Sequence, residues 1–162
     1  MIQSSLTTLL AYALVVSAGA FVATPLMPAA AADDQTCREL DATIVGGPGD
    51  RVVGTPEADV IVATNSSRVS AGGGDDTICY IGQGPINEID SGDGDDYVDL
   101  TQGDLEHVSV KLGRGADLFV GGDSPEHVTT GNALGDDAVD RVSTGAGKDR
   151  VYSGRDAVPT RT

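Results

Sequence analysis

Three octapeptides in residues 71–120 repeat one pattern: Ala71-Gly72-Gly73-Gly74-Asp75-Asp76-Thr77-Ile78, Ser91-Gly92-Asp93-Gly94-Asp95-Asp96-Tyr97-Val98 and Leu112-Gly113-Arg114-Gly115-Ala116-Asp117-Leu118-Phe119. Each reads x-G-x-G-x-D-x-U, in which U is a large apolar residue, and a fourth copy spans residues 144–151. Glycine at alternate positions permits a turn with φ > 0 at no steric cost. The residues after each aspartate alternate polar and apolar, which is typical of a short strand. A unit this small buries no core alone, so the sequence predicts an all-β stack of units, a parallel β-roll or β-helix.

The same turns gather hard oxygen ligands. A curled glycine-rich backbone directs several carbonyl oxygens toward one point, and the aspartate adds an anionic oxygen. Calcium binds about six to eight such oxygens on flexible turns. The sequence therefore predicts Ca²⁺ sites, with metal-binding residues Gly72, Gly74, Asp76, Gly92, Gly94, Asp96, Gly113, Gly115, Asp117, Asp93, Asp95 and Asp149.

The repeat resembles the nonapeptide G-G-x-G-x-D-x-U-x of the RTX, or haemolysin-type, calcium-binding proteins. This resemblance implies a right-handed β-roll built from nonapeptide repeats, with two nonapeptides in each coil and Ca²⁺ between stacked turns along each edge. The match is specific in the units quoted above and is degraded elsewhere. Cys37, Ala42–Gly46 and Gly54-Thr55-Pro56 are similar to the opening of small secreted actinobacterial proteins of this type.

The spacing of the aspartates predicts where the turns lie. Asp76, Asp96 and Asp117 follow one another at intervals of 20 and 21 residues, close to one coil of two nonapeptides. Their turns are therefore expected on one edge of the roll, and the degraded turns at Asn87 and in residues 99–106 on the other. The interval of 32 residues from Asp117 to Asp149 leaves the edge of the last turn open.

Two earlier units depart from the pattern. Glu57 replaces a turn glycine before Asp59, and Ser67 stands at an aspartate position. These units are expected to supply strands, and a calcium site in them is not favoured. The core is expected to be a narrow ladder of the apolar positions Ile78, Ile89, Val98, Val110, Phe119, Val128, Val142 and Val151, with insertions at residues 79–85, 99–106 and 130–138.

Residues 1–32 contain no charged side chain, and an apolar run from Leu9 to Val22 precedes the small residues Ala29–Ala32. This pattern is typical of a secretory signal cut near Ala32, although the stretch is also long enough to remain as a membrane anchor. Cleavage is favoured, which predicts a secreted, extracellular or cell-surface protein without stable membrane insertion. The expected organisation is a signal peptide at 1–32, an N-terminal cap at 33–42, the β-roll at 43–154 and a disordered tail at 155–162.

The chain carries 25 acidic and 10 basic side chains, a net charge of −15. Asp outnumbers Glu, which favours turns and oxygen-ligand sites over a merely solvated acidic surface. This charge argues against nucleic acid as a partner.

Cys37 and Cys79 are the two cysteines of the chain, and in an exported protein they are expected to form a disulfide that ties the cap to the roll.

A catalytic role lacks recognisable parts, because the chain after residue 32 has no Gly-x-Ser-x-Gly and no plausible Cys–His pair. His107 and His127 would make a weak metal pair without a third ligand, so they are interpreted as strand residues. The sequence predicts a non-enzymatic, exported calcium-binding β-roll. The alternatives are a cell-surface structural or adhesive module rigidified by calcium, and the remnant of a larger RTX exoenzyme. No protein partner follows from the sequence.

Overall fold

A computed structural model describes residues 35–131 and 138–153. These residues form strands β1 to β14 and no helix, so no helix long and apolar enough to cross a membrane occurs among them. The predicted signal peptide at 1–32 and the predicted tail at 155–162 lie outside the described residues.

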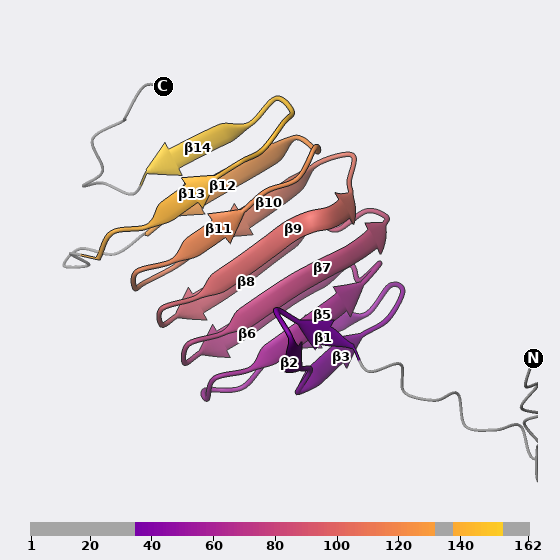
Figure 1. Ribbon diagram of the computed structural model, residues 1–162, viewed down its shortest axis with the longest axis vertical. Coiled ribbons are helices and arrows are strands. Elements are labelled where there is room, and N and C mark those ends of the chain that lie inside the picture. The colour runs from indigo at the N-terminus through magenta and orange to yellow at the C-terminus, as the bar shows by residue number, and fades with distance from the viewer. Residues whose placement is uncertain (1–34, 132–137, 154–162) are drawn as a thin grey trace, which may run out of the picture. The chain divides into compact units, whose positions relative to one another are not determined.

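Two six-stranded parallel sheets make up the fold. The odd sheet has the order β3-β5-β7-β9-β11-β13 and comprises Ile44–Gly46, Val60–Thr64, Thr77–Gln83, Tyr97–Asp104, Leu118–Val120 and Arg141–Ser143. The even sheet has the order β4-β6-β8-β10-β12-β14 and comprises Arg51–Val53, Arg68–Gly73, Glu88–Asp93, Val108–Lys111, Glu126–Thr130 and Arg150–Ser153. The chain alternates between the sheets, so each coil adds one strand to each (Figure 1). The predicted all-β parallel solenoid is confirmed.

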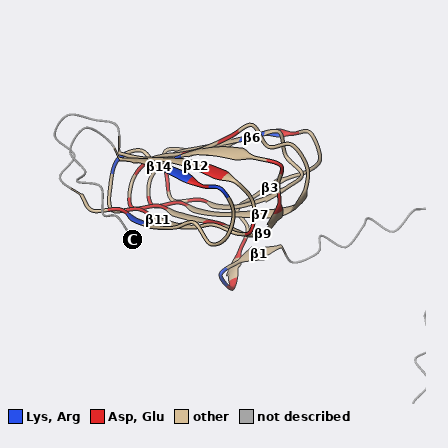
Figure 2. Ribbon diagram, turned by 90° about the horizontal axis from the view of Figure 1, so that it is seen from above, with Lys and Arg blue, Asp and Glu red and all other residues tan. Residues whose placement is uncertain are grey.

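The core is a ladder of apolar side chains between two layers that face each other closely (Figure 2). Each coil places its apolar residue beside that of the next coil, as Ile78 lies beside Val98 in the odd sheet and Ile89 beside Val110 in the even sheet. The predicted core positions are buried as far as Val128. Val142 is only partly buried and Val151 is 50% exposed, because β13 and β14 are the last strands of their sheets and have a neighbour on one side only.

Two predicted insertions lengthen strands instead of forming loops. The coil from Ile61 to Ile78 has 17 residues, whereas the next coil, to Val98, has 20. The extra residues extend β7 and β9, which remain paired to their ends with one shift of register after Cys79. The wider core there is filled by side chains that the repeat pattern does not predict: Tyr80, Leu100 and Leu105. The third insertion, 130–138, falls mostly outside the described residues.

An antiparallel hairpin of β1 (Thr36–Cys37) and β2 (Leu40–Asp41) precedes the coils, where the sequence predicts only a polar cap. It packs on the outer face of the odd sheet, not over the end of the stack (Figure 2). The predicted disulfide between Cys37 and Cys79 is confirmed, with Cα atoms 5.6 Å apart. The Arg38 guanidinium also lies 4.1 Å from the centroid of the Tyr97 ring.

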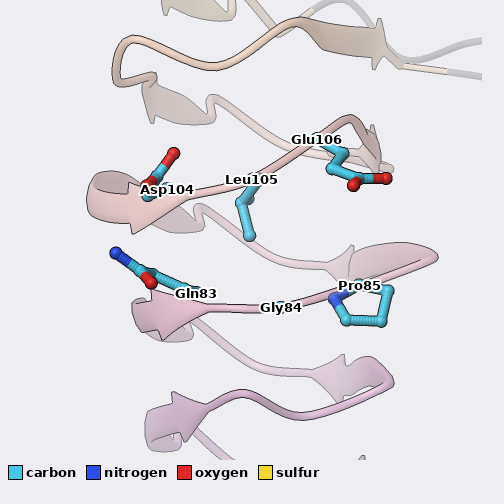
Figure 3. Close-up of a pocket in the computed structure, with 6 residues that line it drawn as sticks. All are labelled: Gln83, Gly84, Pro85, Asp104, Leu105 and Glu106. Carbon is cyan, nitrogen blue, oxygen red and sulfur yellow. The ribbon is translucent and has the colours of Figure 1, made fainter.

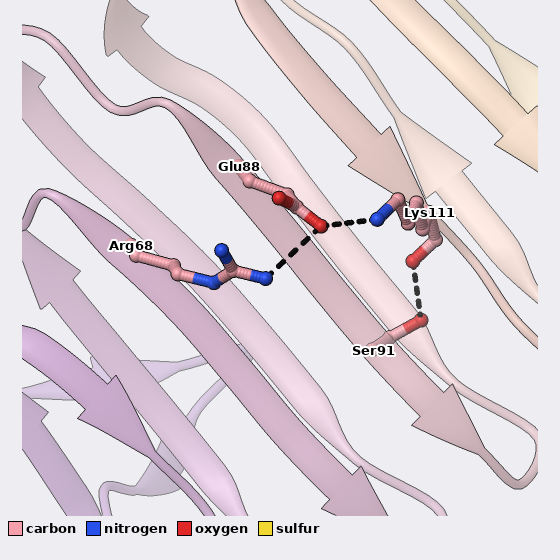
Figure 4. A network of polar contacts seen from close by, with 4 residues as sticks. All are labelled: Arg68, Glu88, Ser91 and Lys111. Carbon is pink, nitrogen blue, oxygen red and sulfur yellow. Dashed lines mark hydrogen bonds and ion pairs between the residues drawn. The ribbon is translucent and has the colours of Figure 1, made fainter.

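The outer face of the even sheet carries a three-residue ion cluster. Glu88 lies between Arg68 and Lys111, on the strands either side of its own (Figure 4). The hydrogen bond from Lys111 lowers the pKa of Glu88, and the positive charges of Lys111 and Arg68 act in the same direction. Such partly exposed pairs contribute little to stability individually, but this cluster links three consecutive coils.

Breaking the disulfide is expected to destabilise the domain. The bridge closes a sequence separation of 42 residues, for which the chain-entropy model gives about 4 kcal/mol. The Cys37→Ser, Cys79→Ser double variant should therefore melt several degrees lower than the parent under oxidising conditions. Melting of both proteins with reductant is the control, since the difference should then largely vanish. Equal melting temperatures without reductant would contradict a stabilising bridge.

Candidate metal-binding turns

The three well-formed turns lie on the same edge of the solenoid, as the spacing predicts. This first edge consists of the turns that lead from the even sheet to the odd sheet. Gly72 pairs with Gly92 and Gly73 with Asp93, and Asp93 in turn forms a bridge with Arg114. The turns at Asn87 and after β9 lead in the opposite direction and form part of the second edge, which is also as predicted.

The glycines of the first edge are required by the close approach of consecutive turns. A Cβ atom at Gly92 would lie 2.1 Å from the carbonyl oxygen of Gly72, and one at Gly94 would lie 2.3 Å from that of Gly74. Both Gly92 and Gly94 have positive φ, at 108° and 141°. The next turn repeats both contacts at Gly113 and Gly115. Main-chain carbonyl oxygens therefore occupy the space between stacked turns.

The aspartates that close these turns form a continuous column, here called the aspartate ladder: Asp59, Asp76, Asp96, Asp117 and Asp140. The main-chain N–H of each donates to Oδ1 of the next, over 2.8, 2.9, 2.9 and 3.1 Å. Asp59 and Asp140, which the sequence does not assign as candidates, belong to it through the register of the coils. Every aspartate of the ladder after Asp59 therefore accepts one main-chain hydrogen bond at Oδ1.

In Asp76 and Asp96, the second carboxylate oxygen, Oδ2, has no hydrogen-bond donor. Asp76 and Asp96 are 1% and 2% exposed, and Oδ2 of each is buried without a hydrogen bond. The Ser91 hydroxyl lies close enough to Asp96 to lower its pKa. Its hydrogen is donated to the Leu112 carbonyl over 2.7 Å and not to Asp96 Oδ2. An unpaired buried carboxylate is costly. Burial accordingly raises the pKa of Asp76 to about 6 and that of Asp96 to about 7, against the lowering effect of the accepted N–H bonds.

Asp59, at the start of the ladder, is different. Its Oδ1 accepts from the Thr43 hydroxyl over 2.9 Å, and its Oδ2 accepts from the main-chain N–H and hydroxyl of Thr55 over 2.8 and 2.9 Å. Burial raises the pKa of Asp59, but these hydrogen bonds outweigh it and the net pKa is lowered. This carboxylate is satisfied as an anion without a cation.

Asp93 and Asp95 lie on the outside of the middle turn. Asp95 is exposed, and its Oδ1 accepts the N–H of Ala116 over 2.8 Å. Asp93 Oδ2 is 3.9 Å from Nη1 of Arg114, and both side chains are exposed. These two predicted ligands therefore lie apart from the buried column and add negative charge around it.

Asp149 lies on the second edge, which settles the placement that its spacing leaves open. Its turn stacks on residues 121–126, since Ala146 N–H donates to the Gly122 carbonyl over 2.9 Å. Glu126 N–H donates to Asp149 Oδ1 over 3.1 Å, the same relation as in the aspartate ladder. This contact does not join Asp149 to Asp96 or Asp117.

Glu126, the first residue of β12, is a buried carboxylate that the sequence analysis does not single out as a candidate. It is fully buried; Oε1 accepts from Gly122 N–H over 3.0 Å, and Oε2 has no donor. Burial raises the pKa of Glu126 to about 7, and the nearby charge of Asp149 adds to the rise. In the register of β12 and β14, His127 pairs with Arg150, so Glu126 stacks at the position of Asp149. The repeat pattern does not show this equivalence, because the coil between them is irregular in length.

A cation on the first edge would have to take most of its ligands from the main chain. In residues 35–131 and 138–153, no three His, Cys, Asp or Glu side chains gather into a group that could hold a metal ion. Calcium accepts backbone carbonyls together with a few carboxylates. The first edge carries both kinds of group: glycine carbonyls between the stacked turns, and a buried carboxylate oxygen without a donor at Asp76 and at Asp96.

The two histidines do not form a metal site of their own. Their ring centroids are 6.0 Å apart in an edge-to-face arrangement. Nη1 of Arg150 lies 2.9 Å from Nε2 of His127, and since a guanidinium only donates, this nitrogen accepts. His127 Nε2 is therefore already used.

A hollow on the second edge offers no better site. It is lined by Gln83, Gly84, Pro85, Asp104, Leu105 and Glu106. The carboxylates of Asp104 and Glu106 are exposed and lie on opposite sides of Leu105 (Figure 3). They do not converge on one point as ligands must.

Comparison of the chain with protein-family models, with curated proteins and with solved structures finds no match in any of the three. The resemblance to the RTX repeats therefore rests on the residues of this chain alone.

The raised pKa values predict that the cation-free protein loses stability as the pH rises. A carboxyl whose pKa is higher in the folded than in the unfolded state stabilises the fold when protonated. That contribution is complete below about pH 4 and is lost through the folded pKa values of about 6 for Asp76 and about 7 for Asp96 and Glu126. In EDTA, the free energy of unfolding should fall by a few kcal/mol between pH 5 and pH 8.

Calcium should reverse this slope, because an ion binds the deprotonated carboxylates. Urea titrations at several pH values measure the pH dependence of the free energy of unfolding, once in EDTA and once in calcium. A cation-free protein that becomes more stable from pH 5 to pH 8 would contradict the assignment of unpaired buried carboxyls.

Proposed function

We propose that this chain is an exported, non-enzymatic calcium-binding β-solenoid, whose Gly/Asp turns hold Ca²⁺ between consecutive coils. The observation that carries the proposal is the unpaired Oδ2 of Asp76 and of Asp96, each buried in a turn that stacks closely on its neighbours. Export is proposed from the uncharged N-terminal stretch together with the disulfide, because bridges persist in oxidising compartments.

The ligands on the first edge would come from pairs of turns. One ion would lie between the turns of residues 72–76 and 92–96, and another between 92–96 and 113–117. Each would use glycine carbonyls and the aspartates that close the two turns. Asp96 belongs to the turn shared by both pairs, so its loss should weaken two sites.

Electrostatics favours a cation at these positions. Parallel coils place consecutive aspartates about 5 Å apart, and two carboxylates at that distance repel by a few kcal/mol at an effective dielectric near 20. The ion pair of Asp93 with Arg114 is exposed and relieves little of this. A divalent ion between the turns would turn the repulsion into attraction.

Calcium binding should order the protein. We expect the domain to be poorly ordered in EDTA and to gain β structure and a higher melting temperature in calcium, because each ion that binds only the folded state adds about 1.4 kcal/mol at tenfold excess over its Kd. Circular dichroism of residues 33–162 with EDTA and then with Ca²⁺ measures this. Magnesium at the same concentration is the control, since its strict octahedral geometry suits these turns poorly. Identical spectra and melting temperatures in EDTA and in calcium would contradict the proposal.

Asp96→Asn should have opposite effects with and without calcium. The amide keeps an oxygen that can accept the Asp76 N–H bond but removes the buried charge. The variant should therefore be more stable than the parent in EDTA above pH 7, and should bind fewer calcium ions in calorimetric titration. Asp104→Asn, at an exposed carboxylate, is the matched control and should change neither property. Full calcium stoichiometry in Asp96→Asn would show that the ions bind elsewhere.

A further inference from the structure

Exposed apolar side chains concentrate at the two ends of the stack. Seven large hydrophobic residues are exposed in the part of the chain that the structure describes, and five of them belong to the first and last coils. Val45 and Val53, in β3 and β4, are 54% and 63% exposed. The others, with exposures from 50% to 69%, are Val139, Val151 and Tyr152. The coils between the two ends bury nearly all of their large hydrophobic side chains.

The same two coils present the open edges of both sheets. Strands β3 and β4 are the outermost at one end, β13 and β14 at the other, and each pairs with one strand only (Figure 1). Strand edges of this kind are templates for pairing with another chain. All pairing between coils is parallel, so the free edge of the last coil matches the free edge of the first.

The charges of the two end coils are complementary. The last coil, residues 138–153, has one excess positive charge, from Arg141, Lys148 and Arg150 against Asp140 and Asp149. The first coil, residues 43–59, has two excess negative charges, from Asp50, Glu57 and Asp59 against Arg51. In a chain with a net charge of −15, a basic end coil is exceptional and favours an acidic neighbour.

We propose that the last coil of one molecule docks on the first coil of a second copy, so that the solenoid continues from chain to chain. The occupant of each exposed end is thus the opposite end of the same protein. The interface is head-to-tail and does not close on itself, so it produces linear oligomers.

Continuation in the register found within the chain gives specific contacts. β14 would pair with β4 of the next copy and β13 with β3. Val151 would lie beside Val52, which is already buried, and Tyr152 beside Val53. The contact would therefore cover the exposed side chains of Val151, Tyr152 and Val53. The cost is Arg150 beside Arg51, a like-charge contact that the fold already tolerates between Arg51 and Arg68.

The contact is small, because only two short strands meet at each end. Interfaces below the standard size are weak or transient. The association should therefore be concentration-dependent and lead to short oligomers.

Sedimentation velocity of the calcium-loaded protein over a range of concentrations tests the proposal. The weight-average mass should rise with concentration. Tyr152→Asp at one end and Val53→Asp at the other should each raise the dissociation constant by about tenfold or more. Leu118→Asp is the control and should associate like the parent, because Leu118 is 36% exposed on β11, an inner strand that is paired on both sides by β9 and β13.

Mixing the two end variants identifies the geometry. Each keeps one intact end, so an equimolar mixture should form one-to-one dimers and nothing larger. A parent protein that stays monomeric at every concentration overturns the proposal. So does association that Tyr152→Asp abolishes but Val53→Asp leaves intact, which would indicate contact between two C-terminal coils. Circular dichroism checks the fold of each variant, and Tyr152→Ser replaces Tyr152→Asp if the last coil fails to form.

Discussion

The fold depends on parallel pairing between coils, which forces each coil to place the same kind of residue beside its predecessor. Where that residue is apolar, the result is a dry ladder such as Ile78 beside Val98. Where it is aspartate, the same rule stacks carboxylates. The main-chain N–H of each aspartate satisfies one oxygen of the next, and this leaves Oδ2 of Asp76 and Asp96 buried without a donor. The register that builds the core thus also creates the electrostatic cost at the edge.

The aspartate ladder is not uniform along its length, and this decides where a cation would matter. At the N-terminal end, Thr43 and Thr55 donate to Asp59, so that its anionic form is stable. Further along, burial rises while donors do not, and the pKa of Asp96 reaches about 7. The first coil can therefore form without an ion, whereas the central coils hold carboxyls that need either protons or a cation.

The repeat pattern was sufficient to predict the strands of the coils and the shared edge of Asp76, Asp96 and Asp117, and the presence of two cysteines in a chain with an expected export signal predicted the disulfide. It was insufficient for Asp140 and Glu126, because their places depend on the register of coils with irregular lengths. It also missed the hairpin of β1 and β2. Its turn residues Arg38 and Glu39 have φ values of 54° and 66°, a conformation that favours glycine or asparagine. The disulfide at Cys37 and the stacking of Arg38 on Tyr97 hold this turn, and neither is visible as a local sequence signal.

In a solenoid, each coil contacts only its neighbours, so stability is a sum over adjacent pairs. An inner coil has two interfaces, whereas an end coil has one and exposes what the other would bury. The first coil compensates partly, through hydrogen bonds to Asp59 and through the hairpin that flanks the next strands. The last described coil has no comparable support: Val151 and Tyr152 are half exposed, and all of β14 is accessible. A neighbour of matching register would therefore stabilise this coil more than any other part of the fold. A second copy docked in this way would be related to the last coil by the same step that relates one coil to the next within the chain.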